Sequence, residues 1–396
     1  MNKSILFLTN TYPDFDTSYR GIFVKKMATL LKEQGYEITV VTPKVYRQSR
    51  YKERQDGMEV YRFPFLSGNK LLIEYGKIPY GRMILYYLMG FFFALYAGFK
   101  NNCDLIHVHW AIPTGLIGVF LRLLIRRPLL VTVHGSDFRL ATEGSALLRR
   151  LFLWVCTRAN HLTCVSGVLR GGMERLGVPQ QKISTFPMGV DGKFLDVGRQ
   201  RNDVPTERPL TVISNRNLLP LYNLSLLIHS IPGVLEKEPG TLFLIAGEGT
   251  QRSDLEKQVK ELKVEKSVRF LGRVAHESMP ELLLNSDIYV STSLSDGTSV
   301  SLLEAMAAGA FPIVTAIPST LEWIKDGENG FLVPATEERV LAERIVRVIR
   351  DRTLLKKGRQ ANMKIVQERA LWPVTIGRVR EIYSKILGSA MQNSVA

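Results

Sequence analysis

Residues 105–134 read LIHVHWAIPTGLIGVFLRLLIRRPLLVTVH, and this stretch indicates the fold class. Two apolar runs, 105–109 and 129–134, have the length of buried strands, and the segment between them is compatible with a helix. A strand, a helix and a second strand in this order are typical of a parallel sheet covered by helices. The same alternation continues in both directions along the chain.

The alternation predicts two sheets. Further strands of the first sheet are expected at 5–9, 37–42 and 162–166. After Gly189-Val190-Asp191 and a polar stretch through Arg208 the pattern begins again, with strands expected at 210–214, 241–246, 268–271, 288–291, 311–315 and 330–333, and a final helix at 372–387. We therefore predict an α/β chain of two doubly wound, Rossmann-like domains facing a central cleft, where such sheets bind ligands.

Composition excludes several classes of protein. The 396 residues are 45% hydrophobic and 22% charged, with unexceptional glycine and proline contents, which is typical of a globular chain of two domains. Three cysteines, without a Cys-x-x-Cys pair, favour neither a disulfide framework nor a zinc ribbon. The apolar run 5–8 is too short for a secretory signal, so a cytoplasmic, reducing location is expected.

The positive charge is concentrated in the first half of the chain. Residues 1–190 contain 25 Lys and Arg against 12 Asp and Glu, whereas the remaining residues contain 27 against 25. Such asymmetry predicts a polyanionic partner, either nucleic acid or the anionic lipids of a cytoplasmic leaflet. No helix-turn-helix, zinc-finger or RNA-binding aromatic signature accompanies the charge, which disfavours nucleic acid and favours peripheral attachment to the inner face of the cell membrane.

An uncharged segment, Met83–Phe99, lies between Arg82 and Lys100. As a helix it would be about 26 Å long, which is short for a membrane span. Three interpretations remain open: a helix buried on a sheet, a spanning helix, and a helix half-exposed at a membrane interface. In the third, tyrosines would lie at headgroup level, namely Tyr80, Tyr86, Tyr87 and Tyr96.

Polar side chains follow two neighbouring strands of the first sheet. His107 and His109 end one strand on the same face, and His134 and Asp137 follow the next. They suggest either a metal site or hydrogen bonding to a polar ligand, and the second is favoured because no His-Glu-x-x-His pattern or cysteine supports a metal. Another acidic pair, Asp14 and Asp16, is interpreted as a solvated loop.

The segment after the first strand argues against a dehydrogenase. No Gly-x-Gly-x-x-Gly follows that strand, so a nicotinamide cofactor is disfavoured. Gly21 stands at the expected start of the first helix. A glycine at this position allows a phosphate to approach the helix N–H groups, although one such glycine is weak evidence alone.

The strongest functional signal is residues 291–309, STSLSDGTSVSLLEAMAAG. A strand end leads into Asp296-Gly297, and free N–H groups at the following helix start, those of Thr298, Ser299 and Val300, can bind phosphate. The two carboxylates, Asp296 and Glu304, can accept hydrogen bonds from sugar and ribose hydroxyls. The alternatives are a helix cap for Asp296 and a solvated helix charge for Glu304.

This stretch resembles the carboxylate-x7-carboxylate motif of the family 4 (group 1) retaining glycosyltransferases of GT-B fold. The similarity extends over nearly the whole chain. It includes further segments, namely His134-Gly135-Ser136-Asp137, Gly189-Val190-Asp191, Ala246-Gly247-Glu248-Gly249, Phe270-Leu271-Gly272 and Asp326-Gly327-Glu328-Asn329-Gly330-Phe331. The resemblance implies a nucleotide-sugar donor, no essential metal or other cofactor, and a saccharide or lipid-linked acceptor.

The resemblance also implies roles for single residues. Glu304 would hold the donor ribose, Asp296 the hydroxyls of the transferred sugar, and Arg216 the diphosphate. His134 would contact the sugar from the opposite domain, and backbone at Arg273 and Val274 would face the base. Residues 1–189 with 372–396 would form the acceptor domain, and residues 190–371 the donor domain.

Three positions depart from the family pattern. Asp296 is one methylene shorter than the usual glutamate, and Met188 replaces a frequent asparagine. Tyr222 stands where a lysine usually helps to stabilise the departing diphosphate. Because that cation is absent, a non-catalytic sugar- or nucleotide-binding homologue is one alternative function. A nucleotide-sugar epimerase, which would share the donor cleft but have no acceptor, is another. Tyr222 can still donate one hydrogen bond to a ligand.

Overall fold

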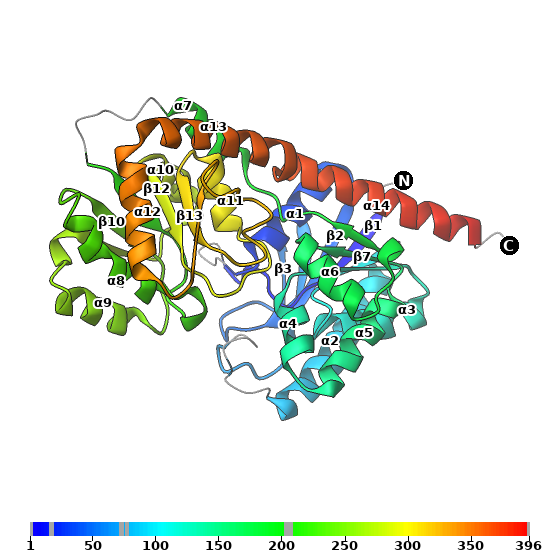
Figure 1. Cartoon of the computed structure of the whole chain (residues 1–396). Coiled ribbons are helices and arrows are strands. Elements are labelled where there is room, and N and C mark those ends of the chain that lie inside the picture. Colours follow the sequence, from blue (N-terminus) through cyan, green and yellow to red (C-terminus); the bar gives the residue numbers. More distant parts are fainter. Residues whose placement is uncertain (1–2, 16–19, 71–74, 76–78, 202–208, 394–396) are drawn as a thin grey trace. The chain divides into compact units, whose positions relative to one another are not determined.

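The computed structural model describes residues 3–15, 20–70, 75, 79–201 and 209–393 and divides the chain into two units (Figure 1). Unit 1 comprises Met1–Phe186 and Thr375–Ala396, and unit 2 comprises Pro187–Val374. The chain therefore passes from one unit to the other twice. Each unit contains one predominantly parallel sheet.

The sheet of unit 1 has the order β3-β4-β2-β1-β5-β6-β7-β8. Only β3 is antiparallel to its neighbour. Because β2 and β5 flank the first strand on opposite sides, the strand order reverses at β1, as in doubly wound domains. The strands are β1 (Ser4–Leu8), β2 (Glu37–Lys44), β3 (Lys52–Gln55), β4 (Met58–Pro64), β5 (Leu105–His109), β6 (Leu129–Val133), β7 (His161–Cys164) and β8 (Ile183–Thr185).

Helices of unit 1 cover this sheet and connect its parallel strands. Helices α2 and α3 pack against each other, and both contact β1. The helices that connect strands are α1 (Ile22–Glu33), α2 (Tyr80–Lys100), α3 (Thr114–Ile125), α4 (Ser136–Glu143), α5 (Ala146–Arg158) and α6 (Gly167–Arg175), with a 3-10 turn η2 (Gln180–Lys182) before β8.

Three strands of unit 1 were not expected from the sequence: β3, β4 and β8. Strand β3 has the sequence KERQ and lies at the sheet edge, where charged side chains are tolerated and protect the edge from pairing with other chains. Strand β8 is only three residues long at the opposite edge. Neither segment therefore carries the continuous apolar run that identifies a buried parallel strand.

Helix α2 is apolar on both sides, and only one side is buried. Tyr86, Ala94 and Ala97 are fully buried, while Leu88 and Phe92 are more than half exposed. Among the described residues, α2 is long and apolar enough to cross a membrane by length and composition. Its inner side packs on the sheet, which fits neither complete burial nor a spanning helix. Tyr86 cannot lie at headgroup level, and the side chain of Tyr80 is outside the described part.

The sheet of unit 2 is entirely parallel and has the order β11-β10-β9-β12-β13-β14. The first strand, β9, again lies where the order reverses, so this sheet is also doubly wound. The strands are β9 (Thr211–Ser214), β10 (Leu242–Ala246), β11 (Val268–Gly272), β12 (Ile288–Ser291), β13 (Phe311–Thr315) and β14 (Phe331–Val333).

Successive side chains of each strand point to opposite faces of this sheet, and different helices cover the two faces. Val212 and Ile313 point into one core, and their neighbours Ile213 and Val314 point into the other. The first core includes residues of α8 (Leu224–Leu235), α9 (Arg252–Glu261) and α12 (Glu338–Arg350). The second includes residues of α7 (Gly192–Gln200), α10 (Met279–Leu284), α11 (Val300–Ala307) and α13 (Arg352–Arg369). Short 3-10 turns complete the unit, namely η3 (Pro220–Tyr222), η4 (Glu265–Ser267) and η5 (His276–Ser278).

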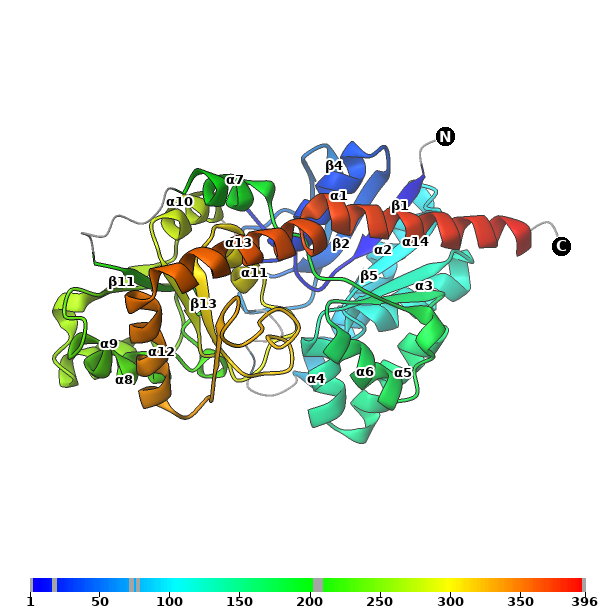
Figure 2. The ribbon, with the colours of Figure 1, turned by 45° about the horizontal axis from the view of Figure 1, so that its top comes forward.

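Helix α14 (Trp372–Asn393), red in Figure 2, begins in unit 2 and continues in unit 1. Its Tyr383 is fully buried in unit 1 and lies 2.7 Å from Nδ1 of His107 through its hydroxyl oxygen. At the start of the helix, Trp372 leaves no room for a Cβ at Gly189. The C-terminal helix thus returns to the N-terminal domain, as expected from the sequence.

Candidate functional site

The carboxyl ends of β9 and β12 lie where the strand order of unit 2 reverses. Ligands of open parallel sheets bind beyond the strand ends at such a reversal. Arg216 follows β9 by two residues, and the segment that contains Asp296 follows β12. Two candidate residues far apart in the sequence therefore belong to the same edge of one sheet.

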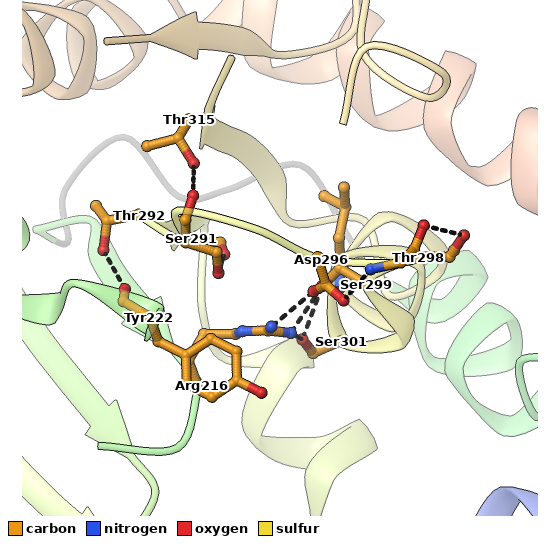
Figure 3. A network of polar contacts seen from close by, with 12 residues as sticks. Arg216, Tyr222, Ser291, Thr292, Asp296, Thr298, Ser299, Ser301 and Thr315 are labelled. Carbon is orange, nitrogen blue, oxygen red and sulfur yellow. Dashed lines mark hydrogen bonds and ion pairs between the residues drawn. The ribbon is translucent and has the colours of Figure 1, made fainter. Parts of the chain in front are cut away.

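Arg216 is the centre of a hydrogen-bonded cluster (Figure 3). Its Nη2 donates to Oδ2 of Asp296 at 2.7 Å, and its Nη1 donates to the hydroxyl oxygens of Ser299 and Ser301 at 2.9 and 2.8 Å. The Ser301 hydroxyl also lies 3.1 Å from that of the buried Tyr289 on β12. These contacts fix the guanidinium in one orientation at the end of the sheet.

One donor of this guanidinium has no partner. The Arg216 side chain is 10% exposed, and its buried Nε has no hydrogen-bond partner among the described residues. Burial lowers the pKa of Arg216, but Asp296 together with Tyr289 and Tyr222 raises it above its ordinary value. The site thus holds a permanent positive charge with an unused N–H group, which suits an anionic ligand.

The ring of Tyr222 lies under the same guanidinium. Its centroid is 4.2 Å from Cζ of Arg216, a cation–π distance. The backbone oxygen of Tyr222 accepts a hydrogen bond of 2.9 Å from the Thr292 hydroxyl, which connects η3 to the segment after β12. Tyr222 therefore does more than occupy the place of a missing cation, because it supports the cation that is present.

The segment between β12 and α11 presents backbone N–H groups next to this cluster. Ser299 is the N-cap of α11, and its hydroxyl accepts from the N–H of Leu302 at 3.2 Å. The cap alternative for Asp296 is therefore wrong, and Asp296 instead accepts from the N–H of Gly297 at 2.9 Å. Thr298 lies between them. Val300 begins the helix, so its N–H has no acceptor inside the helix and can bind an anion.

Glu304 lies on the buried side of α11. The residue is 7% exposed, and its Oε1 accepts a hydrogen bond of 2.9 Å from Nε2 of His276 in η5. A solvated helix charge is therefore excluded. The hydrogen bond with Glu304 raises the pKa of His276, although burial opposes the rise. Because Arg273 and Val274 belong to the loop that precedes His276, this pair brings the loop after β11 to Glu304.

The glycine-containing segment after β10 supports the backbone of Arg216. A Cβ at Gly247 would collide with the carbonyl oxygen of Arg216, so only glycine permits this approach. Next to it, the N–H of Leu218 donates to the carbonyl of Glu248 at 3.0 Å. The segment 246–249 is therefore a packing element that positions the loop carrying the guanidinium.

In unit 1, three histidines form a stack: His107 and His109 lie in the carboxyl-terminal part of β5, and His134 directly follows β6. The rings of His107 and His109 are 4.5 Å apart at their centroids, and those of His109 and His134 are 5.3 Å apart. Nδ1 of His109 lies 3.0 Å from Nε2 of His134. Burial lowers the pKa of His134 to about 3, so the ring is neutral near pH 7. His134 can exchange hydrogen bonds with a ligand and contributes no charge.

The carboxylate of Asp137 is occupied by backbone groups. Its Oδ2 accepts from the N–H of Ala111 at 2.7 Å, and its Oδ1 accepts from the N–H groups of His134, Gly135 and Phe138. Burial raises the pKa of Asp137 to about 6, while these hydrogen bonds act against the rise. In the described ranges, no cluster of three or more His, Cys, Asp or Glu is arranged to hold a metal ion.

Two loop residues of unit 1 have structural reasons of their own. Gly21 is the N-cap of α1 with φ 67°, and a Cβ there would collide with the carbonyl oxygen of Thr11. Asp14, expected in a solvated loop, is buried instead. Its carboxylate accepts a hydrogen bond from the Ser49 hydroxyl at 2.6 Å. It also lies 3.7 Å from Nε of the fully buried Arg62, and a buried guanidinium needs a carboxylate partner to offset its charge. Asp16 lies outside the described residues.

Two family models together match most of the chain. The model described as Glycosyltransferase Family 4 matches residues 21–194, and the model described as Glycosyl transferases group 1 matches residues 197–364. The chain belongs to the family 4, group 1 glycosyltransferases.

Relatives by sequence are distant. The N-acetyl-alpha-D-glucosaminyl L-malate synthase of Bacillus anthracis is 24% identical over 73% of this chain and 76% of its own. The phosphatidyl-myo-inositol mannosyltransferase of Mycobacterium leprae is 24% identical over 94% of both chains. Members of the family thus include proteins named for a small acid acceptor and for a lipid acceptor.

Solved structures show the same fold at lower identity. The sucrose-phosphate synthase of Thermosynechococcus elongatus covers 98% of this glycosyltransferase with 100% of its own chain, at TM-score 0.81 and 18% identity. Anabaena HepE, solved with UDP-glucose, covers 96% with 99% of its own chain, at TM-score 0.75 and 18% identity. The glycosyltransferase has the GT-B fold, in agreement with the sequence expectation.

Three residues that contact Arg216, its cluster or Glu304 were not assigned from the sequence, namely Ser301, Tyr289 and His276. Ser301 lies inside the motif, and no neighbouring residue in the sequence indicates that its hydroxyl contacts Arg216. Tyr289 reads as an ordinary apolar position of a buried strand, and its hydroxyl contact appears only in the fold. His276 follows the carboxyl end of a strand, which was the one available signal.

The contact of Tyr222 with Arg216 leads to a prediction. Tyr222→Phe should retain the activity of the glycosyltransferase, whereas Tyr222→Ala should lower kcat about tenfold, because a cation–π contact is worth about 1–2 kcal/mol. Steady-state kinetics measures both. Tyr222→Lys should lower activity, because it would place a second cation beside Arg216. Full activity of Tyr222→Lys would show that the tyrosine has no positioning role.

The His276–Glu304 pair predicts a pH dependence of stability. Because the folded pKa of His276 is raised above the ordinary 6.5, the contribution of the pair is complete below pH 6.5 and disappears as the pH rises through the folded pKa. The melting temperature of wild type should therefore exceed that of His276→Gln most clearly below pH 6.5. A difference that stays constant across the titration would contradict a charged His276 in the folded protein.

Proposed function

We propose that this protein transfers a hexose from a nucleotide-diphosphate sugar to a hydroxyl acceptor with retention of anomeric configuration. The transfer uses no bound metal or other cofactor. The observation that carries the proposal is the buried Arg216 at the sheet reversal, with its unused Nε donor and the start of α11 beside it. A fixed cation and helix N–H groups are the means by which a metal-free site stabilises a departing diphosphate.

The donor diphosphate would enter by competition with Asp296. Asp296 forms an ion pair with Arg216 at 2.7 Å. A diphosphate that takes over the guanidinium, together with the N–H groups of Ser299 and Val300, releases this carboxylate. Asp296 is then available to accept hydrogen bonds from the hydroxyls of the transferred sugar. Gly297 and Thr298 would provide the backbone next to the phosphates.

The other donor contacts in this proposal are those that the resemblance to the family implies. Glu304 would accept hydrogen bonds from the ribose hydroxyls, and the backbone at Arg273 and Val274 would face the base. From the first domain, Gly21 would allow the phosphates to approach α1, and His134 would hydrogen-bond to the sugar as a neutral ring. The acceptor hydroxyl would attack from the face that the leaving diphosphate occupies, which retains the anomeric configuration.

The acceptor is proposed to be a saccharide or a lipid-linked molecule of the cell envelope, bound by the domain 1–189 with residues 372–396. The donor domain is 190–371. The positive surplus of the first half, and a relative named for phosphatidyl-myo-inositol, support a lipid-linked acceptor over a soluble one. We further propose a cytoplasmic protein attached to the inner face of the membrane, with no nucleic acid partner.

A thermal-shift comparison tests the donor site. Nucleoside diphosphates should raise the melting temperature, because only the native state binds them. The matching monophosphates should raise it less, because they lack the second phosphate that Arg216 would hold. Arg216→Ala should reduce this difference. Slow donor hydrolysis then separates an enzyme from a non-catalytic binding protein, and mass and sugar analysis without acceptor separates a transferase from an epimerase. A protein stabilised by no nucleotide would refute the proposal.

A further inference from the structure

The outer side of α2 presents a continuous apolar stripe. Five large side chains at spacings of three or four residues are each more than half exposed, namely Ile84, Leu88, Phe92, Tyr96 and Phe99. Residues at these spacings lie on one helix face. Soluble proteins rarely expose a contiguous apolar surface of this kind unless it contacts a partner or a membrane.

Neighbouring helices extend this stripe into a wider face. Helix α3 packs against both α2 and α5. Phe120, Leu123 and Leu124 of α3 and Leu147 of α5 are also more than half exposed. Between the three helices is a groove of about 630 Å³, lined by Tyr87, Leu88, Phe91, Leu116, Ile117, Phe120, Leu151 and Trp154. Its lining is almost entirely apolar and offers no charged group to a polar ligand.

The three helices that form this face carry positive charges only. Helices α2, α3 and α5 contain no Asp or Glu. Arg126 and Arg127 directly follow α3, and Arg149 and Arg150 lie in the first half of α5. All four are exposed, and none forms an ion pair with a described residue. Exposed apolar side chains next to unpaired cations are the pattern of a surface that binds anionic lipid.

Two further arginines, Arg122 on α3 and Arg158 on α5, lie close enough for their positive charges to interact. Burial, and then the charge of Arg158 on α5, lower the pKa of Arg122 on α3. Like charges held near one another are stabilised by a negative counter-surface. The repulsion between α3 and α5 therefore adds to the charge complementarity with an anionic leaflet.

We propose that the face formed by α2, α3 and α5 docks on an anionic bilayer, with one lipid acyl chain in the groove. The exposed side chains of the stripe enter the acyl boundary, and the arginines at the helix ends contact the headgroup phosphates. This inference rests on the proposed function for its purpose, which is to bring the enzyme to a lipid-linked acceptor. The evidence for docking does not depend on that function and consists of the exposed apolar stripe, the groove and the exposed arginines.

Flotation of the full-length protein with vesicles tests the electrostatic part. The protein should bind vesicles of equal parts phosphatidylglycerol and phosphatidylcholine at low salt and should bind pure phosphatidylcholine vesicles weakly. Replacing Arg126, Arg127, Arg149 and Arg150 with Gln should weaken anionic binding by at least about 100-fold, from about 1 kcal/mol per cation. A matched control changes four exposed cations of unit 2 to Gln, namely Lys237, Lys257, Lys260 and Lys266. Equal losses in both variants would overturn the proposed face.

Substitutions in the stripe test the apolar part. Leu88→Ser with Phe92→Ser should weaken vesicle binding about tenfold or more, because each buried side chain contributes roughly 1.5–3 kcal/mol. Leu321→Ser is the matched control, since Leu321 of unit 2 and Leu88 are both 54% exposed. If the double variant instead converts a lipid-free dimer to a monomer at unchanged vesicle binding, the face is an interface between copies and the proposal is wrong.

Tryptophan quenching locates the acyl chain. Trp154 lines the groove, whereas Trp110, Trp323 and Trp372 are at most 8% exposed. Phosphatidylglycerol brominated on its acyl chains should quench the fluorescence of wild type, and Trp154→Phe should lose this quenching while vesicle binding persists. Unchanged quenching in Trp154→Phe, or none in vesicle-bound wild type, would refute insertion at the groove.

The thermal shift with nucleoside diphosphates separates this inference from the proposed function. All surface variants should keep the nucleotide-dependent shift of wild type, because none of their side chains belongs to the donor site. Vesicle binding without a nucleotide shift would leave the docking face intact and refute the donor site. A nucleotide shift without binding to anionic vesicles at low salt would refute docking alone.

Discussion

Replacing Arg216 with alanine is expected to lower kcat by about 10²–10³-fold, the cost of losing one preorganised charge stabiliser. The guanidinium is held by Asp296, Ser299 and Ser301 and backed by the Tyr222 ring, so it needs no reorganisation when charge develops on the departing diphosphate. Its effect should therefore appear mainly in kcat. Product formation at saturating donor measures it, and Arg339→Ala, an exposed arginine of unit 2, is the control.

A second variant separates two causes of this loss. Arg216→Ala also leaves Asp296 without its cation, and an unpaired carboxylate would repel a diphosphate. In the double variant Arg216→Ala with Asp296→Asn, that repulsion is absent. Because Asp296→Asn is itself expected to lower turnover, the readout is nucleoside-diphosphate affinity, and recovery of most of that affinity in the double variant would contradict a direct contact of Arg216 with the diphosphate. A rise of KM at unchanged kcat in Arg216→Ala would contradict stabilisation of the departing diphosphate.

Glu304→Gln is expected to weaken binding of a nucleoside diphosphate by about 1.5–3 kcal/mol, roughly 10–150-fold, because charge-assisted hydrogen bonds to the ribose are lost. Asp296→Asn should spare or strengthen binding of the same nucleotide, since it releases Arg216 from its ion pair, and should lower turnover of the sugar donor. Calorimetric titration with the nucleotide and a turnover assay give the two readouts.

The partner of Glu304 provides the control for this result. Glu304→Gln also replaces the ionic contact with His276, so a structural effect must be distinguished from a lost ribose contact. His276→Gln removes the same ion pair and keeps the Glu304 carboxylate, and it should bind the nucleotide within a few-fold of wild type. Equal losses of nucleotide affinity in Glu304→Gln and Asp296→Asn would refute the division of roles between the two carboxylates.

The strands that could be predicted from the sequence are those buried on both faces. The runs 105–109, 288–291 and 311–315 agree with β5, β12 and β13 to the residue. Short apolar runs are typical of strands whose two faces are both covered by helices. Strands β3 and β8, at the two edges of the first sheet, were missed because β3 is charged and β8 has only three residues, and the interior strand β4 was missed because polar residues interrupt its apolar pattern. The sequence left three interpretations of α2 open because both sides of this helix are apolar, although the fold buries only one of them.

The candidate site could be predicted as a list of residues and only partly as an arrangement. Spacing and resemblance identified Arg216, Asp296 and Glu304. The ion pair between Arg216 and Asp296 joins loops eighty residues apart, and nothing in either loop predicts that they neutralise each other in the free protein. Likewise, the stack of Tyr222 on Arg216 requires the turn η3, whose position depends on the whole sheet.

Helix α14 has a consequence for the order of events during synthesis. Tyr383, which fills the core of unit 1 and bonds to His107, is added to the nascent chain after all of unit 2. The core of unit 1 therefore keeps an uncovered apolar surface until the segment that contains Tyr383 has been made, although residues 1–186 of this unit were made first.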